Sequence, residues 1–193
     1  MQHATDNDVS SDYITGTPEE IAERVADPKT GAELLVVHAA GWHSTTTLHF
    51  PHLEDGDMGS AVWTLPGTSV DYRGAHPTHR DVPTVSLASL LTAARLTDLL
   101  HIDVQGVEFE LVEPASAVIQ DHVRLMAIGT TDRLVEGLLQ QHFLSRGWGM
   151  VIDDPCTAIF TMTRPTLAGF TMQDGTQLWE NPFVRDDFVP QPT

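Results

Sequence analysis

The segment from Leu99 to Glu108, LLHIDVQGVE, constrains the fold more than any other stretch of this chain. An apolar run ends at Asp103, a glycine follows at Gly106, and a second acid follows at Glu108. A short apolar run bounded by turn residues is typical of a buried strand in an α/β sheet, and such sheets bind ligands beyond the carboxyl ends of their strands. We therefore expect both acids to flank a strand-to-helix turn at a functional site, where the glycine lets the backbone approach a ligand. An Asp103 that only caps the next helix would fit the same spacing, so both interpretations stay open.

Helical spacing of apolar residues is clear in two long segments. Over 86–100 the leucines fall on one stripe, and over 132–147 the stripe is bounded by a capping Asp132 and a terminating Gly147. Shorter helices are predicted at 17–26, where Thr, Pro and two acids mark the start, and at 107–112.

Short apolar or alternating runs predict strands between these helices. They lie at 33–40, 45–50, 60–65, 100–103, 123–128, 151–152, 158–162 and 176–179. The strands at 45–50 and 60–65 are expected to form a hairpin insert, residues 66–83 a loop, and Asp174-Gly175 a hairpin turn. Because helices and strands alternate before strands pair at the end, the order predicts an open α/β sheet with a C-terminal antiparallel hairpin.

The length of 193 residues fits one domain that can bury a core. We expect residues 1–15 to be disordered or frayed, residues 16–185 to form the domain, and residues 186–193 to be a tail. No apolar run has the length that crosses a bilayer, and residues 1–11 lack the features of a signal peptide. The chain has one cysteine and so no internal disulfide, which favours a cytoplasmic location.

The chain is strongly acidic, with 27 acids against 10 lysines and arginines and a formal net charge of −17. Nucleic acids and anionic membranes bind clustered basic residues, whereas here Lys29 is the sole lysine and the arginines are scattered. The composition therefore argues against nucleic-acid and membrane partners.

Cysteine and histidine have structural interpretations that compete with chemical ones. Cys156 follows two aspartates, which oppose thiolate formation, so we expect a buried structural cysteine rather than a nucleophile. His101 and Asp103 alternate on one strand face and, with Glu108, offer ligands that suit a divalent cation. A metal-dependent hydrolase is thus an alternative, but no metal-ligand spacing of histidines or cysteines supports it and no metal site is predicted.

A set of motifs along residues 33–182 recurs in one enzyme family. Upstream are VHAAG at 37–41 and VPTVSL at 82–87. Further along the chain are HIDVQGVE at 101–108, VRLMAIGT at 123–130, Glu136-Gly137, Gly147-Trp148, Pro155-Cys156, and Asp-Gly-x-Gln-x-Trp-x-Asn-Pro at 174–182. In this order the motifs resemble the FkbM-type methyltransferases.

The resemblance implies a Rossmann-like methyltransferase sheet and S-adenosylmethionine as the cofactor. It also implies a small-molecule or glycan acceptor, methylated on a hydroxyl of a sugar or natural product. By the same resemblance, Asp103 would orient the acceptor hydroxyl or take its proton, Glu108 would orient the acceptor, and Gln105 would hydrogen-bond the cofactor or acceptor. Ala39 and Ala40 would contact the cofactor.

The chain departs from that family near its N-terminus. No strand followed by a glycine cluster precedes residue 31, and YITGTP at 13–18 lacks the acid that would hold a ribose. We therefore expect an N-terminally truncated Rossmann-like sheet, in which the strand at 100–103 is central and the strand at 123–128 is its parallel neighbour. Where the first strand of the family would lie, the strand at 100–103 has an open edge that favours a homodimer. The alternatives are a truncated chain, a chain completed by another polypeptide, and a non-catalytic domain used for binding or assembly.

Overall fold

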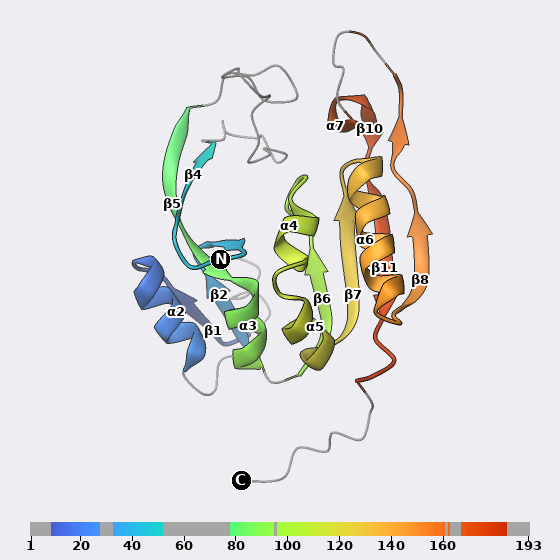
Figure 1. The fold of residues 1–193 in the computed structure, drawn as a ribbon. Coiled ribbons are helices and arrows are strands. Elements are labelled where there is room, and N and C mark those ends of the chain that lie inside the picture. The colour runs from blue at the N-terminus through green and yellow to red at the C-terminus, as the bar shows by residue number, and fades with distance from the viewer. Residues whose placement is uncertain are drawn as a thin grey trace.

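The described part of the chain has a mixed α/β architecture with several small sheets and no barrel (Figure 1). The computed structural model describes residues 9–27, 33–51, 78–94, 96–160, 162 and 167–184. Within these ranges the strands form two sheets of two strands, one of three and one of four. No helix in the described ranges is long and apolar enough to cross a bilayer.

The first unit is a parallel strand pair joined by a helix. Strand β1 (Ser11–Ile14) pairs with β2 (Leu34–Val37), and α2 (Pro18–Ala26) connects them. Thr17 and Glu20 form a reciprocal capping box, so the predicted helix start is confirmed.

Two predictions for this unit are wrong. Residues 11–14, predicted to be frayed, form β1 because Ile14 is fully buried against the apolar face of α2. The predicted buried strand at 33–40 is limited to β2, whose Leu34 and Leu35 are exposed at 40% and 37%. Residues 1–8 lie outside the described ranges.

A three-stranded sheet follows, in which β5 (His79–Ser86) is central. It pairs in parallel with β3 (Ala40–Trp42) and antiparallel with β4 (Thr47–Pro51). The predicted strand at 45–50 is confirmed, but its partner is β5, which occupies part of the predicted loop at 66–83. The Thr84 hydroxyl donates to the carbonyl oxygens of Ser44 and Thr46, which locks the two strands together. Residues 60–65 lie outside the described ranges.

The predicted helix at 86–100 is shorter in the structure. Helix α3 (Leu87–Ala94) ends before residue 100, and Leu99 and Leu100 belong to strand β6 (Thr97–Ile102). These leucines pair in register with the next strand, so sheet hydrogen bonding overrides the helical spacing.

The second unit is a four-stranded sheet in the order β6, β7 (Val123–Thr130), β11 (Gly175–Glu180), β8 (Gly149–Asp154). Strands β6 and β7 are parallel neighbours, as the sequence predicts, whereas β11 is antiparallel to both β7 and β8. Helices α4 (Glu108–Val112), α5 (Ser116–His122) and α6 (Arg133–Ser145) lie over one face of this sheet (Figure 1).

The C-terminal antiparallel pairing is present, but its turn is not at Asp174-Gly175. Strand β8 pairs with β11, and β9 (Thr157–Ala158) pairs with β10 (Thr171–Gln173). The chain reverses direction between β9 and β10, and this connection includes α7 (Leu167–Phe170). Asp174 instead joins β10 to β11, two strands that do not pair with each other. The predicted tail at 186–193 lies outside the described residues.

Two hydrophobic clusters hold these elements, and α3 contributes to both. The smaller cluster consists of Ile14, Ile21, Val25 and Val85, with Leu90 of α3 packed against it. The larger cluster fills the space between the four-stranded sheet and its helices and includes Leu87 and Leu91 of α3. It also includes Trp148 and Trp179, which are both buried.

Candidate active site

The β6–α4 turn places the predicted acids at the carboxyl end of the four-stranded sheet. Asp103 directly follows β6, and Glu108 is the first residue of α4. Between them Gln105 and Gly106 have φ angles of 56° and 100°, a left-handed pair that glycine adopts at little cost and glutamine seldom adopts. Two successive left-handed residues reverse the chain, which turns both acids toward the same end of the sheet.

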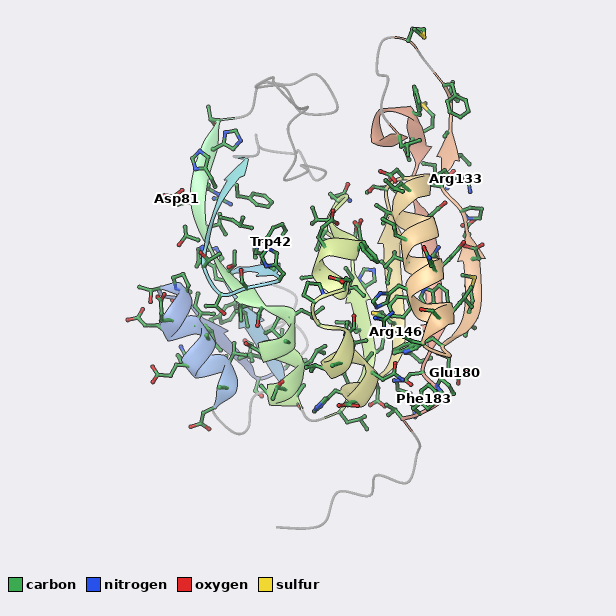
Figure 2. The ribbon with its side chains drawn as sticks, in the orientation of Figure 1. Trp42, Asp81, Arg133, Arg146, Glu180 and Phe183 are labelled. Carbon is green, nitrogen blue, oxygen red and sulfur yellow. The ribbon has the colours of Figure 1, made fainter. Side chains whose placement is uncertain are left out.

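In Figure 2 the label of Arg133 marks this end of the sheet. Arg133 begins α6 there, beside the end of β7, whereas Arg146 and Glu180 lie at the opposite end (Figure 2). The site therefore lies where the parallel strands β6 and β7 end, the position at which α/β sheets bind ligands.

Asp103 is exposed and is held by its neighbours. Its Oδ1 accepts a hydrogen bond of 3.1 Å from Gln105 Nε2. A Cβ on Gly129, in the adjacent strand β7, would lie 3.2 Å from the same oxygen. Gly129 therefore leaves the space that the Asp103 carboxylate occupies, a role that its place in the sequence alone did not reveal.

Glu108 is fully buried, in contrast to Asp103. Its Oε1 accepts a 2.9 Å hydrogen bond from the Gly106 backbone N–H. Burial raises the pKa of Glu108, and the charge of Asp103 raises it further, against the opposing effect of the backbone hydrogen bonds. A carboxyl group with a raised pKa at the end of a strand is typical of a group that exchanges protons with a ligand.

Two buried oxygens at this turn have no hydrogen-bond partner within the described residues. They are Glu108 Oε2 and Thr131 Oγ1. Thr131 Oγ1 would lie 3.4 Å from a Cβ built on Gly106, so it lies against the turn. Buried polar atoms are nearly always paired in folded proteins, so both oxygens have unused capacity for a donor such as a ligand hydroxyl or water.

Asp174 joins the site from a distant part of the sequence. Strand β11 pairs antiparallel with β7, with Gly175 opposite Thr130, so the residue before β11 lies at the carboxyl end of β7. Burial raises the pKa of Asp174, and the charge of Asp103 raises it further. Sequence reasoning took Asp174 as a turn residue, because only the strand pairing brings it to Asp103.

Glu136 ties the strands behind the site together. Its buried Oε1 accepts hydrogen bonds from the Cys156 backbone N–H at 2.5 Å and from the Thr130 hydroxyl at 3.1 Å. A Cβ on Gly175 would lie 2.5 Å from both the Cys156 nitrogen and Glu136 Oε1, so glycine is required there. Cys156 itself is buried, as predicted, and burial followed by the charge of Glu136 raises its pKa to about 11. Its thiol is thus a packing group.

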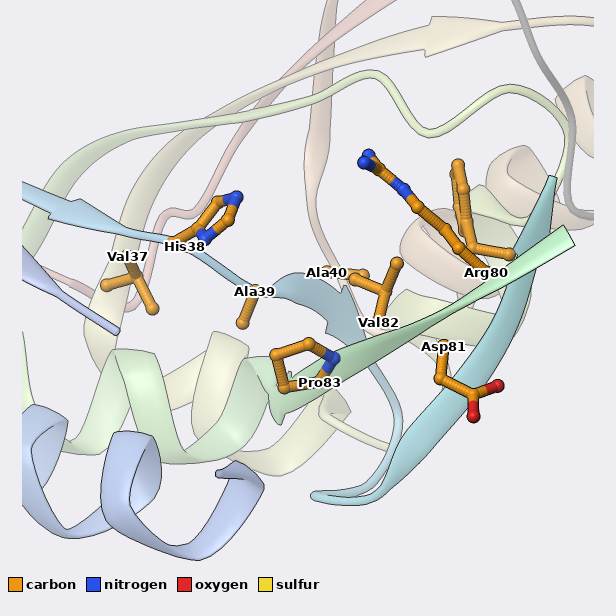
Figure 3. Close-up of a pocket in the computed structure, with 9 residues that line it drawn as sticks. Val37, His38, Ala39, Ala40, Arg80, Asp81, Val82 and Pro83 are labelled. Atoms are coloured by element: carbon orange, nitrogen blue, oxygen red, sulfur yellow. The ribbon is translucent and has the colours of Figure 1, made fainter. Parts of the chain in front are cut away.

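The predicted cofactor contacts Ala39 and Ala40 line a separate pocket of ≈ 300 Å³ (Figure 3). The pocket lies between the end of β2 and the β4–β5 ribbon, and its walls are Val37, His38, Ala39, Ala40, Phe50, Arg80, Asp81, Val82 and Pro83. The structure places Ala39 and Ala40 together in one wall, and their contact with a cofactor stays a prediction.

The histidines do not gather with acids into a metal site in the part of the chain that the structure describes. His101 is exposed on the face of β6 that also carries Asp103. His49 Nδ1 lies 3.1 Å from Asp81 Oδ1, and its ring stacks on His79 with 4.8 Å between centroids.

Comparison with known proteins gives one informative match. Over 139 residues the chain is 32% identical to a protein of Jannaschia sp. (strain CCS1) named "Putative methyltransferase". The match covers 64% of this chain and 48% of that protein, so the chain spans about half the length of the curated relative it matches. No family model matches the chain, and no solved structure matches it.

Proposed function

We propose that this chain is a methyltransferase that uses S-adenosylmethionine and methylates a hydroxyl group of a sugar or another small natural product. The observation that carries the proposal is the β6–α4 turn, which brings Asp103, Gln105 and Glu108 to the carboxyl end of parallel strands. The resemblance of residues 101–108 to the FkbM-type signature and the name of the matched relative support the same activity.

The pocket lined by Ala39 and Ala40 is the part of the structure whose residues can be compared with the shape of the cofactor. Small apolar side chains there, with Val37 and Val82, provide the flat wall that a purine ring needs. In our proposal these alanines contact the cofactor, which supplies an electrophilic methyl group when bound.

The acids would then act on the acceptor. In the proposed reaction, the exposed Asp103 carboxylate would accept the proton of the acceptor hydroxyl. The bound cofactor would supply the methyl group to the acceptor oxygen and would leave as the neutral thioether. Gln105 holds Asp103 through its 3.1 Å hydrogen bond, and the free Oε2 of Glu108 orients the acceptor. Since methyl transfer is a displacement, orientation of the acceptor contributes as much as proton removal.

The test is methyl transfer from radiolabelled S-adenosylmethionine to a panel of monosaccharides and hydroxylated natural products, with the cofactor in large excess because we expect this chain alone to bind it weakly. The alternative that Asp103 only caps the next helix is wrong, because the N-cap of α4 is Val107 and no side chain caps it. Asp103→Asn keeps the shape but loses the base, so turnover should fall ~10²–10⁴-fold while the melting temperature stays unchanged. Glu108→Gln should cause a smaller loss. Asp98→Asn on the same strand β6 is the matched control, because Asp98 is exposed and pairs with Arg124 away from the site. Equal turnover of Asp103→Asn and Asp98→Asn would show that Asp103 has no role in the reaction.

A second candidate is a non-catalytic domain used for binding or assembly. Its specific support is the surrounding of Gly16, which follows β1 with a φ angle of 146°. A Cβ there would lie 2.6 Å from Glu20 Oε2, so this glycine makes room for the capping box rather than for a ligand. Tight binding of a sugar acceptor without methyl transfer to it would favour this candidate.

A further inference from the structure

The pocket between β2 and β5 contains an arginine whose charge no other described residue neutralises. Arg24, Arg124 and Arg133 each lie beside a carboxylate, and Arg146 donates to a backbone carbonyl. Arg80 has no such acceptor within the described residues. Its guanidinium is exposed at the pocket, where its five N–H groups have no acceptor among the described residues and can bind an oxyanion.

The neighbouring acid does not compensate Arg80, because strand alternation turns it away. Figure 3 shows Arg80 and Val82 on one side of β5 and Asp81 on the other. Asp81 has its own partner there, His49. The positive charge of Arg80 is therefore available to a ligand.

His38 provides a second donor at the same pocket. Its ring is exposed, and Figure 3 shows it on the same side of Ala39 as the Arg80 guanidinium. A histidine ring carries at least one N–H in either charge state, so it donates to an oxyanion without having to be protonated.

Asp81 also lines the pocket, with its side chain on the other side of β5, and the remaining lining residues are apolar and mostly short. Alanines at 39 and 40, Val82 and Pro83 offer a low, flat surface, and Phe50 adds an aromatic ring. Such a surface excludes water from the body of a planar ligand, while the polar groups at the rim fix its orientation.

We propose that this pocket binds an organic oxyanion: a small planar apolar molecule whose carboxylate or phosphate pairs with Arg80 and His38. The net charge of −17 repels anions at long range, but exposed charges beyond about 8 Å are screened at physiological salt. Selection of an anion thus depends on the two local donors. The inference goes beyond methyl transfer, because it specifies an oxyanion as the chemical group of an organic ligand that contacts Ala39 and Ala40.

The experiment uses 2-naphthoate and 2-naphthyl phosphate as probes and the neutral 2-naphthamide as their isostere. Binding to the full chain is measured by isothermal titration and by ligand-observed NMR. We expect Arg80→Gln to weaken binding of at least one anionic probe about tenfold, the effect of losing a charge-assisted contact, and to leave binding of the amide unchanged. The relative affinities of the two anions identify the preferred oxyanion.

Arg124→Gln is the matched control, since it removes the same charge from an exposed arginine of β7 that pairs with Asp98. Equal weakening by both variants, or tighter binding of the amide than of either anion, would overturn the inference. So would the absence of saturable binding of the anions to the unmodified chain. Neither anion donates or accepts a methyl group, so this assay reads the pocket even if the proposed methyl transfer is wrong.

Discussion

Asp103 and Glu108 show how burial gives two acids of one turn different chemistry. Asp103 is exposed and accepts a hydrogen bond from an amide, which suits a carboxyl group that meets a ligand. Glu108 is fully buried, and desolvation favours its neutral form. The spacing of acids in the sequence identified both residues, but it carried no information about which of them is removed from solvent.

The raised pKa of Glu108 makes a prediction about stability. A carboxyl group whose folded pKa lies above its unfolded pKa destabilises the fold once pH exceeds the unfolded value, because the unfolded chain then loses the proton more readily. Glu108→Gln removes this penalty. We expect the variant to melt at a higher temperature than the unmodified protein at pH 8, with a difference that shrinks as pH falls toward 5.

Thermal unfolding of both proteins across this range measures the effect. Glu110→Gln, also on α4 but exposed, is the control and should show no such pH-dependent difference. A constant offset between Glu108→Gln and the unmodified protein at every pH would argue for a packing effect instead.

Three residues of the site escaped sequence reasoning because strand pairing assembles it. Asp174 comes to Asp103 only because β11 pairs with β7, Gly129 lies in β7, and Thr131 directly follows it. Gly129 and Asp174 belong to motifs of the family resemblance, but those motifs do not show that the residues meet Asp103. A strand assignment fixes which residues end a strand, but not which strands are neighbours.

At the scale of elements, predictions succeeded where the signals lie within the element. Helices α2 and α6 carry their own caps, Thr17 and Asp132, whose side chains accept the backbone hydrogen bonds expected of them. The prediction of a loop at 66–83 was wrong for the residues of β5, because Pro83 and its neighbours resemble a loop. This strand forms through its pairing with β3 and β4. The helix predicted through residue 100 failed for the same reason, since β6 pairs with β7.

Strand β6 forms one edge of the four-stranded sheet, within the described residues. Its Leu99 side chain is 56% exposed, and an apolar edge strand favours pairing with another chain. We expect the protein to self-associate at high micromolar concentration and Leu99→Lys to shift it toward the monomer. Light scattering across a concentration series measures this effect.

The control is Leu144→Lys on α6, because Leu144 is also 56% exposed but lies on a helix with no free strand edge. A monodisperse monomer for the unmodified protein at every concentration would contradict the prediction. Identical behaviour of the two variants would point to general solubility rather than to the edge of β6.

At the scale of the whole molecule, we expect this chain alone to bind S-adenosylmethionine weakly or not at all. The described residues contain no glycine-rich turn after a strand, and the one glycine after β1 accommodates a capping box. Isothermal titration that gives micromolar affinity would contradict this expectation. Such a result would also mean that the pocket at Ala39 and Ala40 suffices for the cofactor.

The sequence predicted the α/β class, because hydrophobic runs and turn residues carry that information locally. The parallel neighbours β6 and β7 were predicted from the order of helices and strands together with the family resemblance. It did not predict the separate small sheets of the first unit. Those depend on which strands find partners, and partner choice is decided by packing over long sequence separations.

The unequal hydrophobic clusters imply unequal lifetimes for the amide protons of the two units. The smaller cluster rests on Ile14, Ile21, Val25 and Val85, so opening β1 and α2 exposes little apolar surface and requires little free energy. Hydrogen exchange should therefore label the backbone of α2 well before that of β7. The pocket that contains Arg80 borders this weaker unit. A bound ligand would therefore slow hydrogen exchange in β1 and α2 first, and it would leave exchange in the sheet around Trp179 unchanged.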